Sequence, residues 1–308
     1  MENRLYDRDI VSIKDLSKSD LELIFDTTDR LKGMKERVEL CKGRILCYLF
    51  FEPSTRTRLS FESAMLSLGG SSIGFATSKV SSMEKGESLV DTIRVVDNYA
   101  DVIVIRHRLD GAARLAADVA SRPVINAGSG SEEHPTQAII DVYTIKKEKG
   151  RVDGLSVGIV GDLKYSRTVY SLIYALSLYD IDIHLISPQL LRVRKESLYG
   201  IDVDMHEYDS IDDVISILDV IYVTRIQRER FPDRQEYEKV KQSYVVDSRV
   251  LKHAKEDAIV LHPLPRVDEI ADDVDSDRRA MYFKQASYGK DVRAALLALI
   301  LNEKLDVL

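Results

Sequence analysis

Residues 45–58 have the sequence ILCYLFFEPSTRTR, in which an apolar run leads directly into a polar turn. A continuous apolar run of this length is typical of a strand buried on both faces, as in a parallel sheet. The following residues, Leu59 to Leu68, have the composition of a helix, and Gly69-Gly70 is a helix stop signal. The stretch therefore predicts a strand, a short turn and a helix, which is the repeating unit of an α/β domain.

The polar turn brings hydroxyl groups and an arginine to the predicted start of the helix. Its residues are Ser54, Thr55, Arg56 and Thr57. The first N–H groups of a helix have no partner within the helix, so such a turn can bind an anion, most commonly phosphate. Ser and Thr are also the usual N-cap residues, and the same pattern is equally consistent with a capped helix that carries surface arginines.

Composition limits the class of protein. The 308 residues suffice for two domains, and 44% hydrophobic with 31% charged residues is typical of a soluble globular protein. A net charge of -7 argues against general binding to nucleic acid or membrane surfaces. The two cysteines, Cys41 and Cys47, are expected to be buried free thiols in a reducing cytosol, which argues against structural zinc. The polar N-terminus predicts no signal peptide, and no apolar run approaches the ~20 residues of a membrane helix.

Strand and helix patterns alternate along the whole chain. Ser19-Asp20-Leu21-Glu22 has the form of a capping box and predicts a first amphipathic helix. The sequence predicts two α/β units with parallel sheets, divided near Gly150 into residues 1–150 and 151–285. Two final helices, Arg278–Gln285 and Asp291–Asn302, have wide apolar faces, and residues 286–308 are expected to pack back on the first domain. Strands are expected at 45–51, 72–76, 101–107, 123–127, 183–186, 205–208, 220–224 and 259–261, with another beginning at residue 155.

Arginines follow several of these predicted strands, where ligands bind in open parallel sheets. They are Arg56, Arg106, Arg167 and Arg225. Arginine holds phosphate and carboxylate groups bidentately, so a cleft between the two domains would suit polyanionic substrates. The sequence has no pattern typical of a covalent nucleophile, a metal site or a P-loop. The GxxGD at Gly158–Asp162 lacks the glycines of a dinucleotide-binding motif and predicts a strand-end turn. The chemistry is therefore expected to depend on orientation and charge stabilisation.

The polar segment from Thr77 to Glu87 has no apolar period and predicts an exposed loop. One interpretation, which the sequence alone favours, is a solvated connection. The other is a mobile arm that carries Ser81 and Lys85 towards a ligand.

Six motifs occur in a fixed order: FEPSTRTRLSFE, SSMEKGE, HPTQ, GDLKYSRTVYSL, TRIQ and HPLPRVDEI. On these motifs the chain resembles the aspartate/ornithine carbamoyltransferases over nearly its whole length. TRIQ, HPLP and the lysine of SSMEKGE are similar to the aspartate-specific branch, whereas an ornithine-specific chain would carry an HCLP-type segment. Arg106-His107-Arg108 departs from the RHP expected in the family, which affects the expected shape of that loop.

The resemblance implies two doubly wound domains with the active site in the interdomain cleft, no cofactor, and transfer of a carbamoyl group from carbamoyl phosphate to L-aspartate. Residues 1–150 would bind carbamoyl phosphate and residues 151–285 would bind aspartate. The implied phosphate ligands are Ser54, Thr55, Arg56 and Thr57, and those of the carbamoyl part are Arg106, His134 and Gln137. Aspartate would be bound by Arg167, Arg225 and Gln227, with backbone contacts from Pro263 and Leu264. Arg56, Thr57, Lys85, Arg106 and His134 are the implied catalytic residues.

The resemblance also implies a homotrimer in which Ser81 and Lys85 enter a neighbouring subunit's site. Aligning the family motif from Lys85 without a gap selects Ser81, with Ser82 as the alternative. The cysteines and the polar N-terminus predict a cytoplasmic protein, and the sequence leaves open whether a separate zinc-containing regulatory chain is a further partner. Two alternatives remain. One is a carbamoyltransferase for another amino acid such as ornithine, although Arg167, Arg225 and Gln227 suit a dicarboxylate. The other is a non-catalytic ligand-binding homologue, which the complete set of donors argues against.

Overall fold

The computed structural model describes residues 3–34, 39–77, 86–131, 133–226, 240 and 244–305. The chain forms two compact units, the first comprising Met1–Ile140 with Tyr288–Leu308 and the second Asp141–Ser287. The division falls within two helices, α5 (Pro135–Lys149) and α9 (Tyr282–Leu301). The boundary predicted near Gly150 lies where α5 ends.

The first unit is built on a four-stranded sheet with the order β2-β1-β3-β4, and every pair in it is parallel. The predicted strand-helix alternation and the α/β class are confirmed. Because the strands are parallel, their carboxyl ends lie along one edge of the sheet, where polar loops can meet. The elements are β1 (Ile45–Phe50), α2 (Thr55–Ser67), β2 (Ser71–Phe75), α3 (Leu89–Val96), β3 (Val102–His107), α4 (Ala112–Val119), β4 (Val124–Ser129) and α5.

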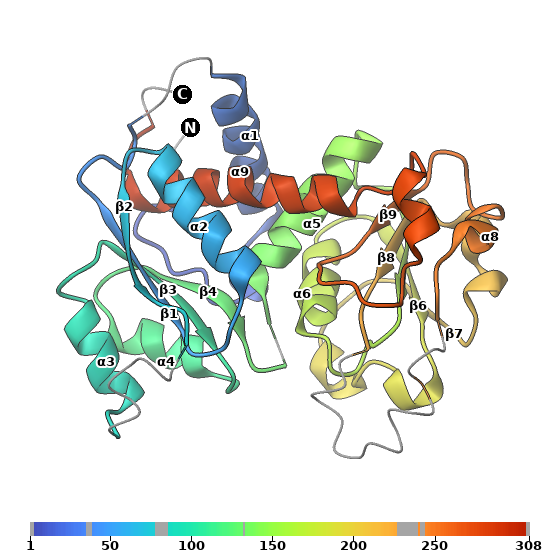
Figure 1. The fold of residues 1–308 in the computed structure, drawn as a ribbon, viewed down its shortest axis with the longest axis horizontal. Helices are drawn as coiled ribbons and strands as arrows, with labels where there is room; N and C mark the ends of the chain where they lie inside the picture. The colour runs from blue at the N-terminus through green and yellow to red at the C-terminus, as the bar shows by residue number, and fades with distance from the viewer. Residues whose placement is uncertain are drawn as a thin grey trace. The chain divides into compact units, whose positions relative to one another are not determined.

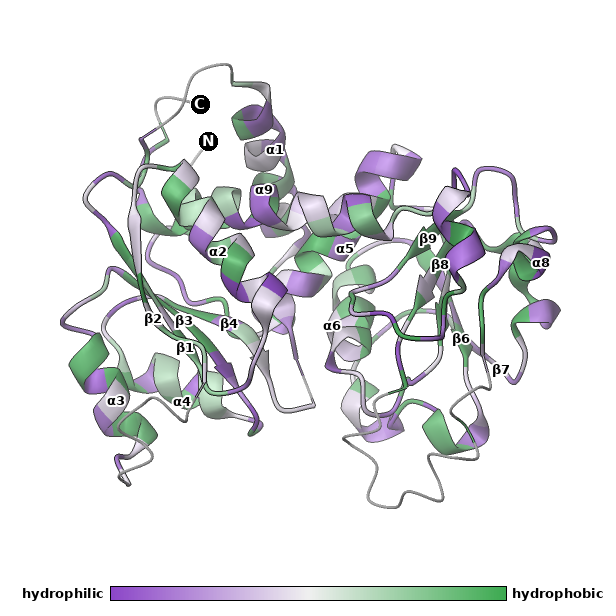
Figure 2. Cartoon of the chain, viewed as in Figure 1, coloured by the Kyte–Doolittle hydropathy of each residue, from purple (hydrophilic) through white to green (hydrophobic). Residues whose placement is uncertain are grey.

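Helices cover both faces of this sheet, with α3 and α4 on one side and α2 on the other (Figure 1). Every residue of β3 is buried, as the apolar run of the sequence predicts. On the α3–α4 side, Leu49 and Ile105 pack with Ile93 of α3 and Ala116 of α4. The central strands accordingly consist mainly of hydrophobic residues, whereas the outer helices carry both hydrophobic and hydrophilic residues (Figure 2).

The first helix, α1 (Lys18–Gly33), begins earlier than predicted. Its N-cap is Ser17, whose side chain accepts from the Asp20 N–H while the Asp20 carboxylate accepts from the Ser17 N–H at 2.9 Å. The capping box predicted at Ser19–Glu22 is therefore wrong. Aspartate takes the place of the usual Glu/Gln at the third helical position, so the pattern shifts by two residues.

The second unit has a five-stranded parallel sheet with the order β7-β6-β5-β8-β9. Gly158 lies inside β5, and a Cβ built there would be 2.4 Å from a Leu218 methyl, so this glycine makes room for packing. The strands and α-helices described here are β5 (Leu155–Val160), α6 (Arg167–Leu176), β6 (Ile181–Ile186), β7 (Met205–Tyr208), β8 (Val220–Val223), α8 (Ser248–Leu251) and β9 (Ile259–Leu261). Short 3-10 helices are η1 (Ile13–Asp15), η4 (Gln189–Leu191), η5 (Lys195–Leu198), η6 (Ile211–Asp213), η7 (Ile215–Ile217) and η9 (Asp272–Ser276).

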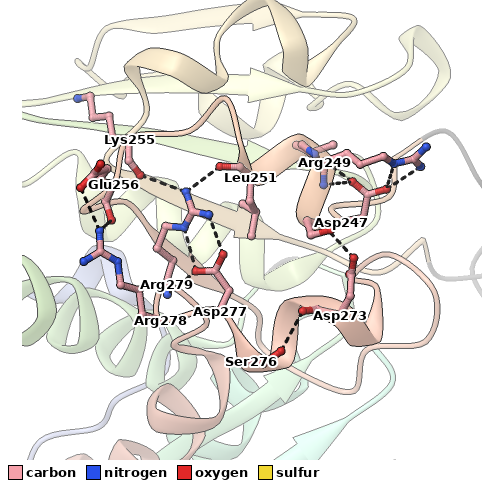
Figure 3. Close-up of polar contacts among 12 residues, drawn as sticks. Asp247, Arg249, Leu251, Lys255, Glu256, Asp273, Ser276, Asp277, Arg278 and Arg279 are labelled. Atoms are coloured by element: carbon pink, nitrogen blue, oxygen red, sulfur yellow. Dashed lines mark hydrogen bonds and ion pairs between the residues drawn. The ribbon is translucent and has the colours of Figure 1, made fainter.

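The segment before α9 pairs alongside β9. The Val260 N–H donates to the Arg279 carbonyl at 2.8 Å, and the Met281 N–H returns a bond to the Val260 carbonyl at 2.9 Å. The Arg279 guanidinium makes two bonds to Asp277, at 2.9 and 2.7 Å, and a third to the Leu251 carbonyl at 2.7 Å (Figure 3). These bonds fix the direction in which the chain enters α9.

A single helix, α9, replaces the two final helices that the sequence predicts. Gly289 lies within this helix, and a Cβ built there would be 2.9 Å from Arg293 Nη1. The glycine thus gives space to a buried guanidinium one turn later, and this outweighs its low helix propensity. Among the described residues, none of the helices combines the length and hydrophobicity that crossing a membrane would require.

Candidate functional site

The start of α2 presents the residues of the predicted anion cradle. Ser54 occupies the N-cap position, but its side chain makes no capping hydrogen bond. The Ser54 hydroxyl instead donates to Thr57 Oγ1 at 2.9 Å. The alternative that Ser54 is an ordinary side-chain cap is therefore wrong. The first turn of α2, from Thr55 to Thr57, keeps backbone donors that can face an anion.

The side chains of this turn differ in their exposure to solvent. Thr55 and Arg56 are exposed, whereas Thr57 is buried. Partial desolvation lowers the pKa of the Arg56 guanidinium from its ordinary value, although arginine stays a cation in proteins. A cation and three hydroxyl groups at a helix start, where the helix dipole is positive, favour a multiply charged anion.

Arg106, at the end of β3, is held by bonds to β4 and to the segment that leads into α2. Its Nη1 donates to the Ala127 carbonyl at 2.9 Å, and its Nη2 lies 3.4 Å from a Glu52 carboxylate oxygen. The Phe51 N–H donates to the Arg106 carbonyl at 2.8 Å, so backbone and side chain both fix its position. Arg106 is 9% exposed, and a buried guanidinium held in this way is preorganised to bind a ligand oxygen.

His134 and Gln137 lie at the start of α5, directly after the end of β4. His134 is buried, and its carbonyl accepts from the Gln137 N–H at 3.0 Å. Pro135 is the first residue of α5, as the sequence predicts. Of the nine site residues predicted in the first unit, the seven that the structure describes therefore lie along the carboxyl edge of one sheet, whereas Ser81 and Lys85 lie outside the described residues.

In the Arg106-His107-Arg108 segment, the departure from RHP is Arg108, and the preceding His107 shapes the loop. His107 Nδ1 accepts from the Leu109 N–H at 3.0 Å, and the imidazole contacts the Phe51 ring at a centroid distance of 5.0 Å. Burial, followed by the nearby Arg108 cation, lowers the pKa of His107. The uncharged ring thus shapes this loop while Arg106 keeps its place.

In the second unit, Arg167 is the first residue of α6 and is 7% exposed. The turn before it is held by Asp162, whose buried carboxylate accepts from the N–H groups of Lys164 at 3.1 Å and Tyr165 at 2.8 Å. The GxxGD segment is therefore a strand-end turn, as predicted, and it leads Arg167 to the carboxyl end of β5.

A pocket lies at the carboxyl ends of β5 and β8. Its lining includes Gly161, Thr224, Ile226, Tyr244 and Glu269. Gly161 has φ +113°, and a Cβ there would be 2.4 Å from the Thr224 carbonyl, so only glycine fits. Arg225 lies between two lining residues and is partly buried. The second unit therefore places the Arg225 backbone next to this small pocket, at the expected edge of its sheet.

Pro263 and Leu264 follow β9, at the same edge as Arg225. Both are partly buried, and Leu264 has φ +53°, which is rare for a residue with a branched side chain. Ser81, Lys85 and Gln227 lie outside the described residues. Among the residues that the structure does describe, no group of three or more His, Cys, Asp or Glu side chains is arranged to hold a metal ion.

Sequence reasoning missed two partners in these sites, Glu52 beside Arg106 and Glu269 beside His262. Glu52 directly precedes the Pro53 turn and could be suspected from its place in FEPST. The contact between His262 Nε2 and Glu269 Oε1, at 2.7 Å, depends on how the loop after β9 folds back on itself. No spacing rule for helices or strands predicts that contact.

Both halves of the chain match known families. Residues 8–147 match "Aspartate/ornithine carbamoyltransferase, carbamoyl-P binding domain", and residues 153–300 match "Aspartate/ornithine carbamoyltransferase, Asp/Orn binding domain". The chain therefore belongs to the aspartate/ornithine carbamoyltransferase family.

Relatives within this family carry a more specific name. The aspartate carbamoyltransferase catalytic subunit of Nitrosopumilus maritimus is 59% identical, covering 98% of this chain and 99% of its own length. That of Thermococcus gammatolerans is 57% identical, with 96% and 98% covered. Among solved structures, the Trypanosoma cruzi aspartate transcarbamoylase in complex with carbamoyl phosphate has a TM-score of 0.91 at 40% identity, with 97% and 98% covered. The catalytic subunit of M. jannaschii aspartate transcarbamoylase has a TM-score of 0.86 at 49% identity, with 94% and 97% covered.

Proposed function

We propose that this chain is an aspartate carbamoyltransferase, which transfers the carbamoyl group of carbamoyl phosphate to the α-amine of L-aspartate. The products are N-carbamoyl-L-aspartate and phosphate, and the reaction serves pyrimidine biosynthesis. The observation that carries the proposal is the uncapped start of α2, with Arg56 beside it and Arg106 fixed at the adjoining strand end. This arrangement suits a phosphorylated substrate with a carbonyl group next to the phosphate.

The first unit would bind carbamoyl phosphate. Ser54, Thr55, Arg56 and Thr57 would bind the phosphate, with the N–H groups of α2 as further donors. Arg106, His134 and Gln137 would hold the carbamoyl group. When the amine attacks, the carbonyl oxygen becomes negative, and donors already fixed around it stabilise that charge. Removing one such donor typically costs about 2.7–4 kcal/mol of transition-state stabilisation.

The second unit would bind L-aspartate. Arg167 and Arg225 carry the positive charges that a dicarboxylate requires, and Gln227 would add a neutral donor. Pro263 and Leu264 would contact the transferred group through their backbone. The carboxylate of Glu269 already accepts from His262 and two backbone N–H groups, which leaves it poorly placed to receive a cationic side chain such as that of ornithine.

The departing phosphate would accept the proton that the amine loses. In this scheme the attacking nitrogen forms a bond to the carbamoyl carbon, the bond from that carbon to the phosphate oxygen breaks, and the proton leaves with phosphate. Arg56, Thr57, Arg106 and His134 would stabilise the charges, and Lys85 would add another cation. Positioning of the two substrates supplies much of the remaining rate enhancement.

A direct test of the phosphate site is calorimetric titration with inorganic phosphate and with carbamoyl phosphate. Arg56→Ala should weaken binding of both ligands at least roughly tenfold, because it removes a charge-assisted bond. Arg225→Ala is the control and should bind both normally. Unchanged affinity in Arg56→Ala, with the fold intact, would contradict the placement of phosphate at α2.

The assembly is part of the same proposal. We infer a homotrimer in which Ser81 and Lys85 complete a neighbouring subunit's site, together with a separate zinc-containing regulatory chain. The relatives' designation as catalytic subunits supports the idea of a second type of subunit. Sedimentation of the purified chain and co-purification from its source cells test the two points separately.

A mixing experiment tests the shared site. Lys85→Ala and Arg56→Ala chains should each be nearly inactive, because each lacks one cation of the site. After dissociation, mixing and reassembly, hybrid trimers should regain activity, since some sites then combine an intact Arg56 with an intact Lys85. Hybrid trimers that are verified by charge separation, yet are no more active than the parents, would rule out sharing.

A further inference from the structure

The loop after β9 contains an unusual backbone conformation at Leu264. Its φ of +53° lies in the left-handed region, which is energetically unfavourable for a non-glycine residue. Such a conformation persists only where surrounding bonds enforce it. The bonds made by the residues around Leu264 therefore indicate what holds the loop in this form.

His262 makes the enforcing bond. The Leu264 N–H donates to His262 Nδ1 at 2.8 Å, and His262 is 2% exposed. Because Nδ1 accepts, the proton of the neutral imidazole must reside on Nε2. That atom lies 2.7 Å from Glu269 Oε1, so Nε2–H donates to the carboxylate and the tautomer is fixed.

Glu269 is itself held in place. Its second oxygen, Oε2, accepts from the N–H groups of Val267 and Asp268, both at 3.1 Å. Burial acts to raise the pKa of Glu269, but the bond from His262 and the backbone donors outweigh burial, and the pKa lies below its ordinary value. For His262, burial is the largest influence and lowers the pKa. The pair is thus a neutral donor facing a carboxylate.

A second chain of bonds anchors the other side of His262. Its backbone N–H donates to Gln285 Oε1 at 2.9 Å, and Gln285 Nε2 donates to Asp141 Oδ1 at 2.6 Å. The Tyr222 hydroxyl donates to the other Asp141 oxygen at 2.8 Å. These three partners come from α9, α5 and β8, so the loop is fastened to three elements of the second unit.

We propose that His262, held in one tautomer by Glu269, is a positioning residue that fixes the Pro263–Leu264 backbone in the form required for carbamoyl transfer. The inference rests on the proposed function, in which that backbone contacts the transferred group. His262 acts through the Leu264 N–H and does not touch substrate. Its loss should therefore lower kcat more than it weakens the binding of carbamoyl phosphate by the first unit.

Two amide substitutions separate the two bonds of the imidazole. In His262→Asn the side-chain oxygen can stand where Nδ1 stands and accept from Leu264. In His262→Gln the longer side chain can reach Glu269 but offers no acceptor at the Nδ1 position. Both variants are polar and similar in shape, so general effects on folding are matched. Kcat, the KM for aspartate and the Kd of carbamoyl phosphate should be measured for both.

The expected result is that kcat of His262→Gln falls roughly 100-fold, which is the loss of rate expected when reacting groups are slightly misplaced. His262→Asn should retain at least about tenfold more activity than His262→Gln, and carbamoyl phosphate should bind both normally. Glu269→Gln should give an intermediate loss. His184→Asn, a buried histidine elsewhere in the second unit, is the control and should keep wild-type kcat.

Equal activity of the two amide variants, or greater activity of His262→Gln, would overturn the proposal. If neither amide variant folds, Glu269→Gln decides, and wild-type kcat in that variant would overturn it. An inactive wild-type protein would contradict the proposed function instead, so the two failures are distinguishable.

Discussion

Ser54 and Thr57 bond to each other through their hydroxyl groups, at 2.9 Å, across the first turn of α2. An ordinary N-cap would turn the Ser54 oxygen towards a backbone N–H and reduce the helix's capacity to bind an anion. The observed pair leaves that capacity in place at the carboxyl edge of the sheet.

Arg56→Ala should reduce kcat by roughly 100-fold or more, because in the proposed scheme the guanidinium would stabilise the charge that develops on the departing phosphate. The residue is exposed in the free chain, so its loss should change the free energy of unfolding by less than about 0.5 kcal/mol. Arg58→Ala is the matched control on the same helix, since Arg58 lies 3.4 Å from Glu62. Comparable activity of the two variants would remove Arg56 from the mechanism.

Substitutions in the second unit should affect the use of aspartate and spare carbamoyl phosphate. Arg225→Ala and Gln227→Ala are each expected to raise the KM for aspartate at least about tenfold, because under the proposed function a substrate carboxylate would lose a hydrogen bond, charge-assisted in the case of Arg225. Equilibrium binding of carbamoyl phosphate to each variant is the discriminating measurement. A large loss of carbamoyl phosphate affinity would contradict the proposed division of labour.

Arg293 of α9 supports α2 from inside the first unit. Its Nη1 donates to Ser60 Oγ at 2.8 Å, and its guanidinium lies 4.9 Å from the centre of the Phe61 ring. Arg293→Met should lower the free energy of unfolding by about 2–4 kcal/mol, because buried polar groups lose their partner. Ser60→Ala should cost about 1 kcal/mol. The two losses should not add in the double variant, since the residues share a bond. Full additivity in chemical denaturation would show that the Arg293–Ser60 bond contributes little.

Stability should depend on pH through His184. Burial, and then the nearby His206, lower the pKa of His184, which is 4% exposed. The unfolded chain therefore binds a proton more readily, and the free energy of unfolding should fall as pH decreases below about 6.5. His184→Gln should flatten this slope between roughly pH 7 and 5, by at most about 1.4 kcal/mol per pH unit.

The control for that experiment is Tyr208→Phe. It removes the hydroxyl 3.2 Å from His184 Nδ1 while leaving the imidazole able to titrate, so the slope should persist. Identical slopes for the wild type and His184→Gln would show that this histidine does not contribute to the acid sensitivity.

Much of the fold could be predicted because strands buried in a parallel sheet have continuous apolar sequences. The run at 45–51 is such a case, and β1 occupies nearly all of it. The capping box was misplaced because Asp20 replaces the more usual Glu or Gln, and local pattern matching then favoured Ser19. The sequence predicts two final helices, whereas the structure has the single helix α9, in which Gly289 leaves the space that the Arg293 guanidinium needs.

The sequence could predict only part of the candidate site. Arg106 and Arg167 could be named because parallel strands bring their following loops to one edge. The 2.7 Å contact of His262 with Glu269 could not, because a loop without periodicity determines it. The bond from Arg106 to the Ala127 carbonyl could not be predicted for a different reason: it joins neighbouring strands where their register shifts between Ile105 and His107, and an apolar run does not reveal such a shift.

The most direct test of the central claim is a turnover assay of the purified chain with carbamoyl phosphate and L-aspartate, compared with L-ornithine. The wild type should release N-carbamoyl-L-aspartate and phosphate in equal amounts and show little turnover with ornithine, and Arg56→Ala should abolish most of that activity. A folded wild-type chain that forms no N-carbamoyl-L-aspartate, or that carbamoylates ornithine faster, would contradict the account.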